Sequence, residues 1–451
     1  MNYIDYRVKI ICFFPKKIVA FLVFLTEILL FSKASAIVFE RRNEAKPEFG
    51  YFIAPVPVSI PGVQKALILG FSIYSIEIPG IEDAPFDVLG GVGAGDGTKW
   101  FEGKDFRAYA LVFLDVPLLS KNLTLSTGIE YVEVFTYPSG ERGIDSDPDR
   151  TIYFLGERGY LFNSEVSLYL LNKQLEFFYT NFVLNYDPYG YIDYDENFIS
   201  AGNAGMTDNP IVDLYGILVD DTDSRRDPRI GYRIQLDRWN WPGRFKEEPS
   251  YYQYDLDISG YIPFINQKLI LAFNQFVSSS KVKQQGSVNK EDWTCTPTEN
   301  TANPFCQSLK NQIYERLSEE SKKGKATSLG GRDRMRGYRE QRFFDENTNY
   351  RALELRWYVT ETKIDFDFFV EKGIFTGFQL AAFFEQGTVS PDMGSRFWKN
   401  FRNSYGIASR FLFNSAIIRA NLPFGMVTPF DFMEKKSNTS DLETNIFVIN
   451  L

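Results

Sequence analysis

The stretch GGRDRMRGY at residues 330–338 and the stretch FFEQGTV at residues 383–389 decide how this chain is expected to fold. The first ends in an Arg-Gly-Tyr turn at residues 336–338, and the second is an aromatic strand with one carboxylate, Glu385. An arginine in a shielded space needs a fixed anionic partner, because a buried unpaired charge is costly. The two stretches together predict a closed barrel whose loop folds back inside and places Arg336 against Glu385.

Each residue of the turn suits an inward loop tip. Arg336 offers five donors in a planar fork, and a carboxylate accepts two of them. Gly337 permits a tight turn close to the barrel wall, and Tyr338 can stack and form a hydrogen bond. Glu385 is expected to point inward, because its neighbours in a strand then face the other side. The alternative is that Arg336 and Glu385 are unrelated solvated charges.

Composition favours strands over membrane helices. The 451 residues include 42 Phe and 26 Tyr, and 24% are charged. From residue 66 onward, strand-length segments alternate apolar and polar residues between turn signals. Strands of about 9–11 residues cross a bilayer at a tilt. The series predicts an all-β, antiparallel transmembrane barrel of about 14 to 16 strands.

The connections between these segments are of two kinds. Residues 171–173 and 266–267 are tight turns, whereas residues 187–209 and 278–349 form long polar connections. Short and long connections alternate in outer-membrane barrels. The segment 278–349 is the longest, so we expect an external loop with a mobile outer part and an ordered tip in the lumen. Within it, residues 311–325 form a charged stretch with helical potential.

The N-terminus has the features of an export signal. Lys16 and Lys17 precede an apolar run, and residues 34–36 supply a small-residue cleavage site. A single-span anchor is the alternative, although Glu27 interrupts the short run. We expect a signal peptide at 1–36, a short periplasmic segment at 37–65 and an outer-membrane barrel at 66–451.

The cysteine and histidine residues of the chain limit which covalent links, catalytic sites and metal sites it can form. Cys295 and Cys306 lie in a Thr/Asn/Pro-rich stretch of an exported chain, which predicts a local disulfide; two unpaired thiols are the alternative. The chain has no histidine, which removes serine-histidine hydrolases, histidine general bases and most zinc sites. We therefore expect no enzyme activity, metal or cofactor. The formal charge of -9 gives little support for nucleic-acid binding, which is usually marked by a positively charged surface.

Several motifs resemble those of the bacterial surface antigen, or outer-membrane assembly-factor, superfamily. Its members include the barrel-assembly insertase and the two-partner secretion transporters. The resemblance runs from about residue 220 to the C-terminus. In chain order it rests on Asp220-Asp221-Thr222, Asp227-Pro228-Arg229-Ile230-Gly231-Tyr232, Gly330-Gly331 with Arg336-Gly337-Tyr338, Glu354-Leu355-Arg356, Phe383-Phe384-Glu385-Gln386-Gly387, Ser404-Tyr405-Gly406 with Arg410, and Ile418-Arg419-Ala420-Asn421.

The resemblance implies a barrel of about 16 strands whose sixth external loop folds into the lumen. It implies that Arg336 contacts the acidic strand residue, which is Glu385 here in place of the usual aspartate. Gly387 belongs to the same strand motif. Glu354 and Arg356 share one strand face and are expected to receive the loop, although ordinary polar lining of a lumen explains them equally well.

The resemblance also implies a function at the outer membrane. We expect the chain to aid insertion or translocation of proteins, or of lipids, through a seam between the first and last strands. Its partners would be outer-membrane lipid, client proteins and a separate periplasmic protein, because no polypeptide-transport-associated repeats are expected before the barrel. A passive or gated pore plugged by the loop, and an adhesin that uses the cysteine-containing loop, are the alternatives.

Overall fold

The protein is described here by a computed structural model. It describes residues 49–59, 65–81, 84–95, 106–136, 142–146, 154–192, 198–200, 210–225, 227–243, 245–297, 305–331, 333–338, 341–368, 371–413, 424–425, 427–430 and 448–449. The expected signal peptide lies outside these residues.

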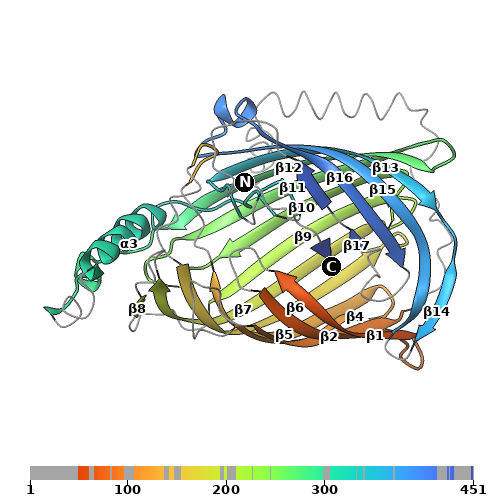
Figure 1. Ribbon diagram of the computed structural model, residues 1–451, viewed down its shortest axis with the longest axis horizontal. Coiled ribbons are helices and arrows are strands. Elements are labelled where there is room, and N and C mark those ends of the chain that lie inside the picture. Colours follow the sequence, from red (N-terminus) through yellow and green to blue (C-terminus); the bar gives the residue numbers. More distant parts are fainter. Residues whose placement is uncertain are drawn as a thin grey trace, which may run out of the picture. The chain divides into compact units, whose positions relative to one another are not determined.

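The described residues form one antiparallel sheet of 19 strands. Figure 1 shows the long strands lying side by side, and each pairs with its neighbours in the chain. The fourteen long strands have 10 to 20 residues: β1 (Gly50–Ser59), β2 (Lys65–Ile76), β3 (Phe86–Gly95), β4 (Phe106–Ser120), β5 (Leu123–Thr136), β6 (Phe154–Leu170), β7 (Leu175–Ile192), β9 (Ile211–Thr222), β10 (Gly231–Trp241), β11 (Ser250–Phe264), β12 (Leu269–Gln284), β13 (Asn347–Thr360), β15 (Glu371–Ser390) and β16 (Arg402–Phe413). The short strands are β8 (Phe198–Ser200), β14 (Ile364–Phe368), β17 (Phe424–Gly425), β18 (Val427–Phe430) and β19 (Val448–Ile449).

The two faces of the sheet have opposite character. On β13, Leu353, Leu355 and Trp357 are exposed, whereas Glu354 and Tyr358, which point to the other face, are buried. Other strands repeat this alternation, with apolar and tyrosine side chains on the exposed face and charged or amide side chains on the covered face. An apolar exterior around a polar interior is the arrangement of a transmembrane β-barrel. The predicted all-β, antiparallel barrel fold is confirmed.

The apolar exterior has the height of a bilayer core. On β6 exposed side chains occur from Tyr160 to Leu170, and on β11 the outward-facing residues extend from Tyr254 to Phe264, with Tyr254, Ile262 and Phe264 exposed. Ten residues of strand span about 33 Å, or about 25 Å of height at the usual tilt. Both tyrosines lie toward the long connections and both last residues precede a tight turn, so the band extends between these two ends.

The sheet begins earlier than predicted. β1 pairs with β2 along its whole length, so residues 50–59 belong to the sheet and not to a periplasmic segment. Proline at positions 55 and 57 hid this strand in the sequence, because proline is rare inside sheets and is tolerated at an edge. β1 also meets β15 at one pair, Phe52 and Glu371. Within the described residues this single pair does not close the sheet as a continuous ladder.

The two predicted tight turns are present. Residues 171–173 and 265–267 join β6 to β7 and β11 to β12, and all six adopt positive φ. The long loop is shorter than predicted, because β12 extends to Gln284 and β13 begins at Asn347. No helix in the described ranges is long and apolar enough to cross a membrane.

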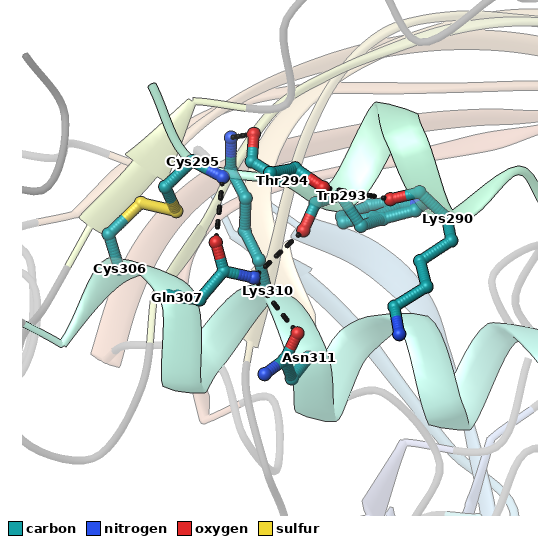
Figure 2. Close-up of a disulfide and its surroundings, with 8 residues drawn as sticks. All are labelled: Lys290, Trp293, Thr294, Cys295, Cys306, Gln307, Lys310 and Asn311. Carbon is teal, nitrogen blue, oxygen red and sulfur yellow. Dashed lines mark hydrogen bonds between the residues drawn. A yellow bond between two sulfur atoms is a disulfide. The ribbon is translucent and has the colours of Figure 1, made fainter. Parts of the chain in front are cut away.

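The outer part of the long loop is a small disulfide-linked unit. It contains the short helix η2 (Lys290–Trp293) and the helix α3 (Cys306–Glu320), which overlaps the predicted helical stretch. Figure 2 shows the predicted bridge between Cys295 and Cys306, whose Cα atoms lie 6.3 Å apart. Gln307 of α3 accepts a 3.0 Å hydrogen bond from the backbone N–H of Cys295, so the bridge also anchors the start of the helix.

Candidate functional site: a loop tip held against the inner wall

The loop tip, meaning the described part of residues 329–338, is a compact turn. The backbone of Leu329 exchanges hydrogen bonds with that of Phe343, and the N–H of Gly331 donates to the carbonyl of Tyr338 at 2.9 Å. Met335 has a φ of 61° and is fully buried, as is Leu329. This tight turn presents both the side chain and the backbone N–H of Arg336 to the barrel wall.

Arg336 binds Glu385 through two separate donors. Its Nε donates to Oε1 at 2.7 Å, and its backbone N–H donates to Oε2 at 2.7 Å. The hydroxyl of Tyr350 donates to Oε1 at 2.9 Å, so both oxygens of this fully buried carboxylate are occupied. The guanidinium also lies 3.6 Å from the ring centroid of Phe383. The contact predicted between Arg336 and Glu385 is present.

Glu354 is the centre of a wider charge cluster. Its carboxylate accepts from Arg336 Nη1 at 2.8 Å and from Arg356 Nε at 2.7 Å, and it lies 2.7 Å from Arg410 Nη1. We call Arg336, Arg356, Arg410, Glu354 and Glu385 the arginine network. It holds three positive and two negative charges, so neither acid can be lost without leaving buried arginines short of partners. Burial opposes the charge on Arg336, but the facing carboxylates outweigh it and raise the pKa of this loop residue.

The remaining predicted residues lie at the same place. The backbone N–H of Gly337 donates to Ser404 Oγ at 2.8 Å, and the hydroxyl of Tyr338 donates to the carbonyl of Asn403 at 3.2 Å. A Cβ on Gly387 would lie 2.6 Å from Leu329 and 3.0 Å from Met335. A larger residue at position 387 would have to displace the side chains of Leu329 or Met335, so the loop tip packs directly on the wall there.

A second set of contacts ties the loop to another part of the wall. Thr327 Oγ1 donates to Asp255 at 2.9 Å, and Arg334 Nη2 donates to Asp257 at 3.3 Å. Both acids lie on the covered face of β11, while the wall residues of the arginine network lie on β13, β15 and β16. The loop tip therefore bridges separate strands across the inner face.

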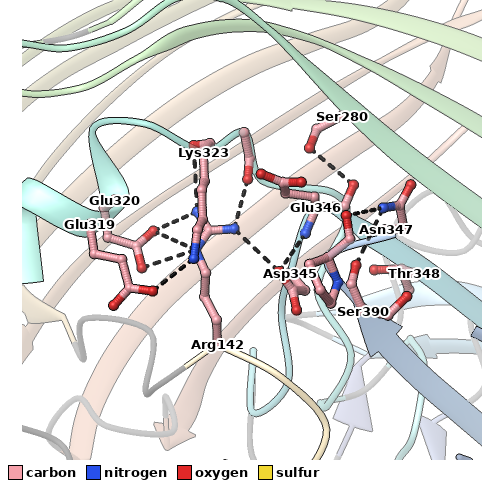
Figure 3. Close-up of polar contacts among 12 residues, drawn as sticks. Arg142, Ser280, Glu319, Glu320, Lys323, Asp345, Glu346, Asn347, Thr348 and Ser390 are labelled. Carbon is pink, nitrogen blue, oxygen red and sulfur yellow. Dashed lines mark hydrogen bonds and ion pairs between the residues drawn. The ribbon is translucent and has the colours of Figure 1, made fainter. Parts of the chain in front are cut away.

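Sequence reasoning missed a contact between two loops. Figure 3 shows Arg142, from the β5–β6 connection, between the end of α3 and the segment before β13. Its Nη2 lies 2.6 Å from Glu320, and its Nη1 donates to the carbonyl of Gly324 at 2.8 Å. Nearby, Arg342 Nη2 donates to the carbonyl of Ser146 at 2.6 Å. We call these contacts of Arg142 and Arg342 the outer latch. No local sequence signal marks the outer latch, because it joins two long connections far apart in the chain.

The motif stretch after β9 forms a separate polar turn. Thr222 donates to Asp220 at 2.5 Å, and Asp223 accepts from the backbone N–H groups of Arg229 at 2.8 Å and Ile230 at 3.1 Å. Gly231 has a φ of 109°, which favours glycine. This turn shapes the entry into β10. Across the described residues, no three Cys, Asp or Glu side chains are grouped as ligands for a metal.

Comparisons with known proteins find similarity among solved structures. No family model matches the chain, and no curated protein matches it in sequence. Similar structures include BamA from Haemophilus ducreyi lacking POTRA domains 1–3, with 13% identity, a TM-score of 0.45, and coverage of 90% of this chain and 69% of that one. CdiB from Escherichia coli has 11% identity, a TM-score of 0.47, and coverage of 93% and 66%. CdiB from Acinetobacter baumannii has 10% identity, a TM-score of 0.42, and coverage of 89% and 58%.

Proposed function

We propose that this chain is an outer-membrane barrel of the bacterial surface antigen superfamily that aids insertion or translocation of proteins, or of lipids, at that membrane. The observation that carries the proposal is the arginine network. The order of the motifs in the sequence is matched by contacts from Arg336 to Glu385 and Glu354 at 2.7 and 2.8 Å. A loop fixed to the inner wall holds the barrel in one arrangement while its strands exchange partners elsewhere.

The edge of β1 supports a seam that can open. N–H groups of successive residues point to opposite edges of a strand, so the proline positions 55 and 57 share one edge. Pairing with β2 continues through both positions, so the missing donors belong to the other edge of β1. That edge is the one that meets β15 at Phe52. Two missing donors weaken strand pairing there, which suits an edge that must release and admit other strands.

Depletion of the protein tests this function. The proposal expects a fall in the abundance of some outer-membrane or secreted proteins, or an altered lipid composition, measured by quantitative proteomics and lipid analysis of isolated outer membranes. Complementation with the intact chain should restore the profile, whereas a Glu354→Gln chain should restore it poorly. An unchanged membrane profile after depletion would contradict the proposal.

A pore plugged by the loop is the alternative, favoured by the way that the loop tip bridges β11 and β15. Planar-bilayer recording separates the two functions. A steady, solute-selective conductance from the intact chain favours the pore, and brief or absent openings favour the assembly function. Identification of client proteins, and of any separate periplasmic partner, follows from co-purification after gentle solubilisation.

A further inference from the structure

Three basic side chains gather on the exterior of β10 and β12. Arg238, Lys281 and Lys283 are all exposed. The guanidinium of Arg238 lies 4.6 Å from the ring centroid of Tyr252, and the ammonium of Lys283 lies 5.7 Å from it. Lys281 is the cross-strand neighbour of the same tyrosine. We call these four residues the basic patch.

The basic patch has no acidic partner in the described part of the chain. Neither an ion pair nor a hydrogen bond from Arg238, Lys281 or Lys283 occurs among those residues. Three adjacent cations are unusual in a chain whose formal charge is -9. On β4–β6, by contrast, Glu133 lies opposite both Arg107 and Arg158. The basic patch therefore has unused capacity for an anion.

The position of the basic patch places it at the membrane surface. Tyr254, which is 44% exposed, is the first exposed residue of the apolar band on β11, and Arg238 lies directly opposite it. Tyrosines mark the interface of a bilayer, and basic side chains just beyond them reach lipid headgroups. The apolar band below excludes a soluble protein as the occupant, because lipid tails cover it.

We infer that the basic patch binds the phosphate groups of a glycolipid headgroup in the leaflet at the loop end of the barrel. Arginine matches a phosphate with two parallel donors, and lysine adds a mobile point charge. The exposed Tyr254 adds a flat surface and a hydroxyl beside the cations, which suits a sugar-bearing headgroup. This inference is independent of the arginine network and of the function proposed above.

Lipid retention by the purified barrel tests the inference. The full chain is reconstituted into phosphatidylcholine vesicles that contain lipid A, and bound lipid A is measured by native mass spectrometry after release into detergent. Arg238→Gln with Lys281→Gln and Lys283→Gln is expected to bind lipid A about a hundredfold more weakly, because each cation near an anionic surface contributes separately. Salt at about 1 M should weaken binding by the intact chain, since it screens exposed charges.

Two controls make the result decisive. Lys121→Gln with Lys173→Gln and Lys268→Gln removes the same charge at the tight-turn end and should leave lipid A binding unchanged. Arg238→Lys with Lys281→Arg and Lys283→Arg keeps the charge and should retain binding, which separates a charge effect from misfolding. Equal retention by the glutamine variant and the intact chain would overturn the inference. Equal binding of dephosphorylated lipid A, or full competition by inorganic phosphate at equal concentration, would also overturn it.

Discussion

The long loop is held in two regions by different means. Its tip lies against the inner wall, where buried charges meet at 2.7–2.8 Å and Glu385 has no exposed surface. Its outer part is held by one disulfide, by the outer latch and by pairs such as Lys323 with Glu319, which are 35% and 57% exposed. Contacts deep in the wall depend on strand register, whereas the outer part depends on local links. Changes in one region should therefore leave the other intact.

The largest expected effect comes from Glu354→Gln. This change leaves Arg336, Arg356 and Arg410 with one fewer carboxylate in a buried site, and removing one partner from a buried charge cluster costs about 3–5 kcal/mol. The free energy of unfolding, measured by urea titration of the barrel in lipid vesicles, should fall by that amount. The exposed Glu361→Gln, whose partner is Arg229, is the control, with an expected change below about 1 kcal/mol. Equal effects would contradict a special role for Glu354.

Arg336→Ala should release the loop tip while the barrel stays folded. The change removes the side-chain donors to Glu385 and Glu354, and the expected loss is about 3 kcal/mol of loop docking. Protease cleavage within residues 322–341 and single-channel conductance should both increase. Arg334→Ala removes a partly exposed 3.3 Å contact with Asp257 and should change both far less. Unaltered cleavage and conductance in the Arg336 variant would contradict a loop tip held in place by the arginine network.

Removal of the disulfide should affect only the outer part. Cys295→Ser with Cys306→Ser opens a short covalent loop, which costs about 2–3 kcal/mol of local stability. Amide hydrogen exchange in η2 and at the start of α3 should speed up, while amides near Arg336 keep their protection. Faster exchange at the loop tip would show that the two regions are coupled.

The smallest effect concerns pH at the end of α3. A hydrogen bond from Lys323 lowers the pKa of Glu319. A lowered carboxyl pKa adds stability above the unfolded value of about 4.3, and this stability is lost as pH falls through the folded value. Because the pair is exposed, the loss should be about 0.3–0.5 kcal/mol. Intrinsic-rate-corrected exchange in the last turn of α3 should rise below that pH in the intact chain and change less in Lys323→Gln.

Much of the barrel wall, and the contact between Arg336 and Glu385, could be predicted from sequence. Alternation alone put Glu385 on the inner face, and motif order put Arg336 beside it. The third arginine, Arg410, was visible as a motif position, but its partner depends on the register of three neighbouring strands. β3 is harder to predict, because its glycine-rich sequence has few side chains to show an alternation.

The outer latch could not be predicted for a different reason. Arg142 and Glu320 lie in two long connections whose meeting point is set by the barrel and not by either segment. The basic patch has the same origin, since Arg238 and Lys281 come together only when β10 and β12 flank β11. Local patterns therefore gave the strands and the buried pairs on them, while contacts between connections needed the three-dimensional arrangement.

A cysteine pair at Met335 and Gly387 tests the central claim most directly, because a Cβ added at position 387 would lie 3.0 Å from Cγ of Met335. Met335→Cys with Gly387→Cys, in a chain with Cys295→Ser and Cys306→Ser, is oxidised in native membranes, digested and examined by mass spectrometry. Met335→Cys with Ile407→Cys, an exterior position, is the control. The account predicts a disulfide-linked peptide pair for positions 335 and 387 and none for the control. Two free, alkylated thiols at positions 335 and 387 would contradict a loop tip held against the inner wall.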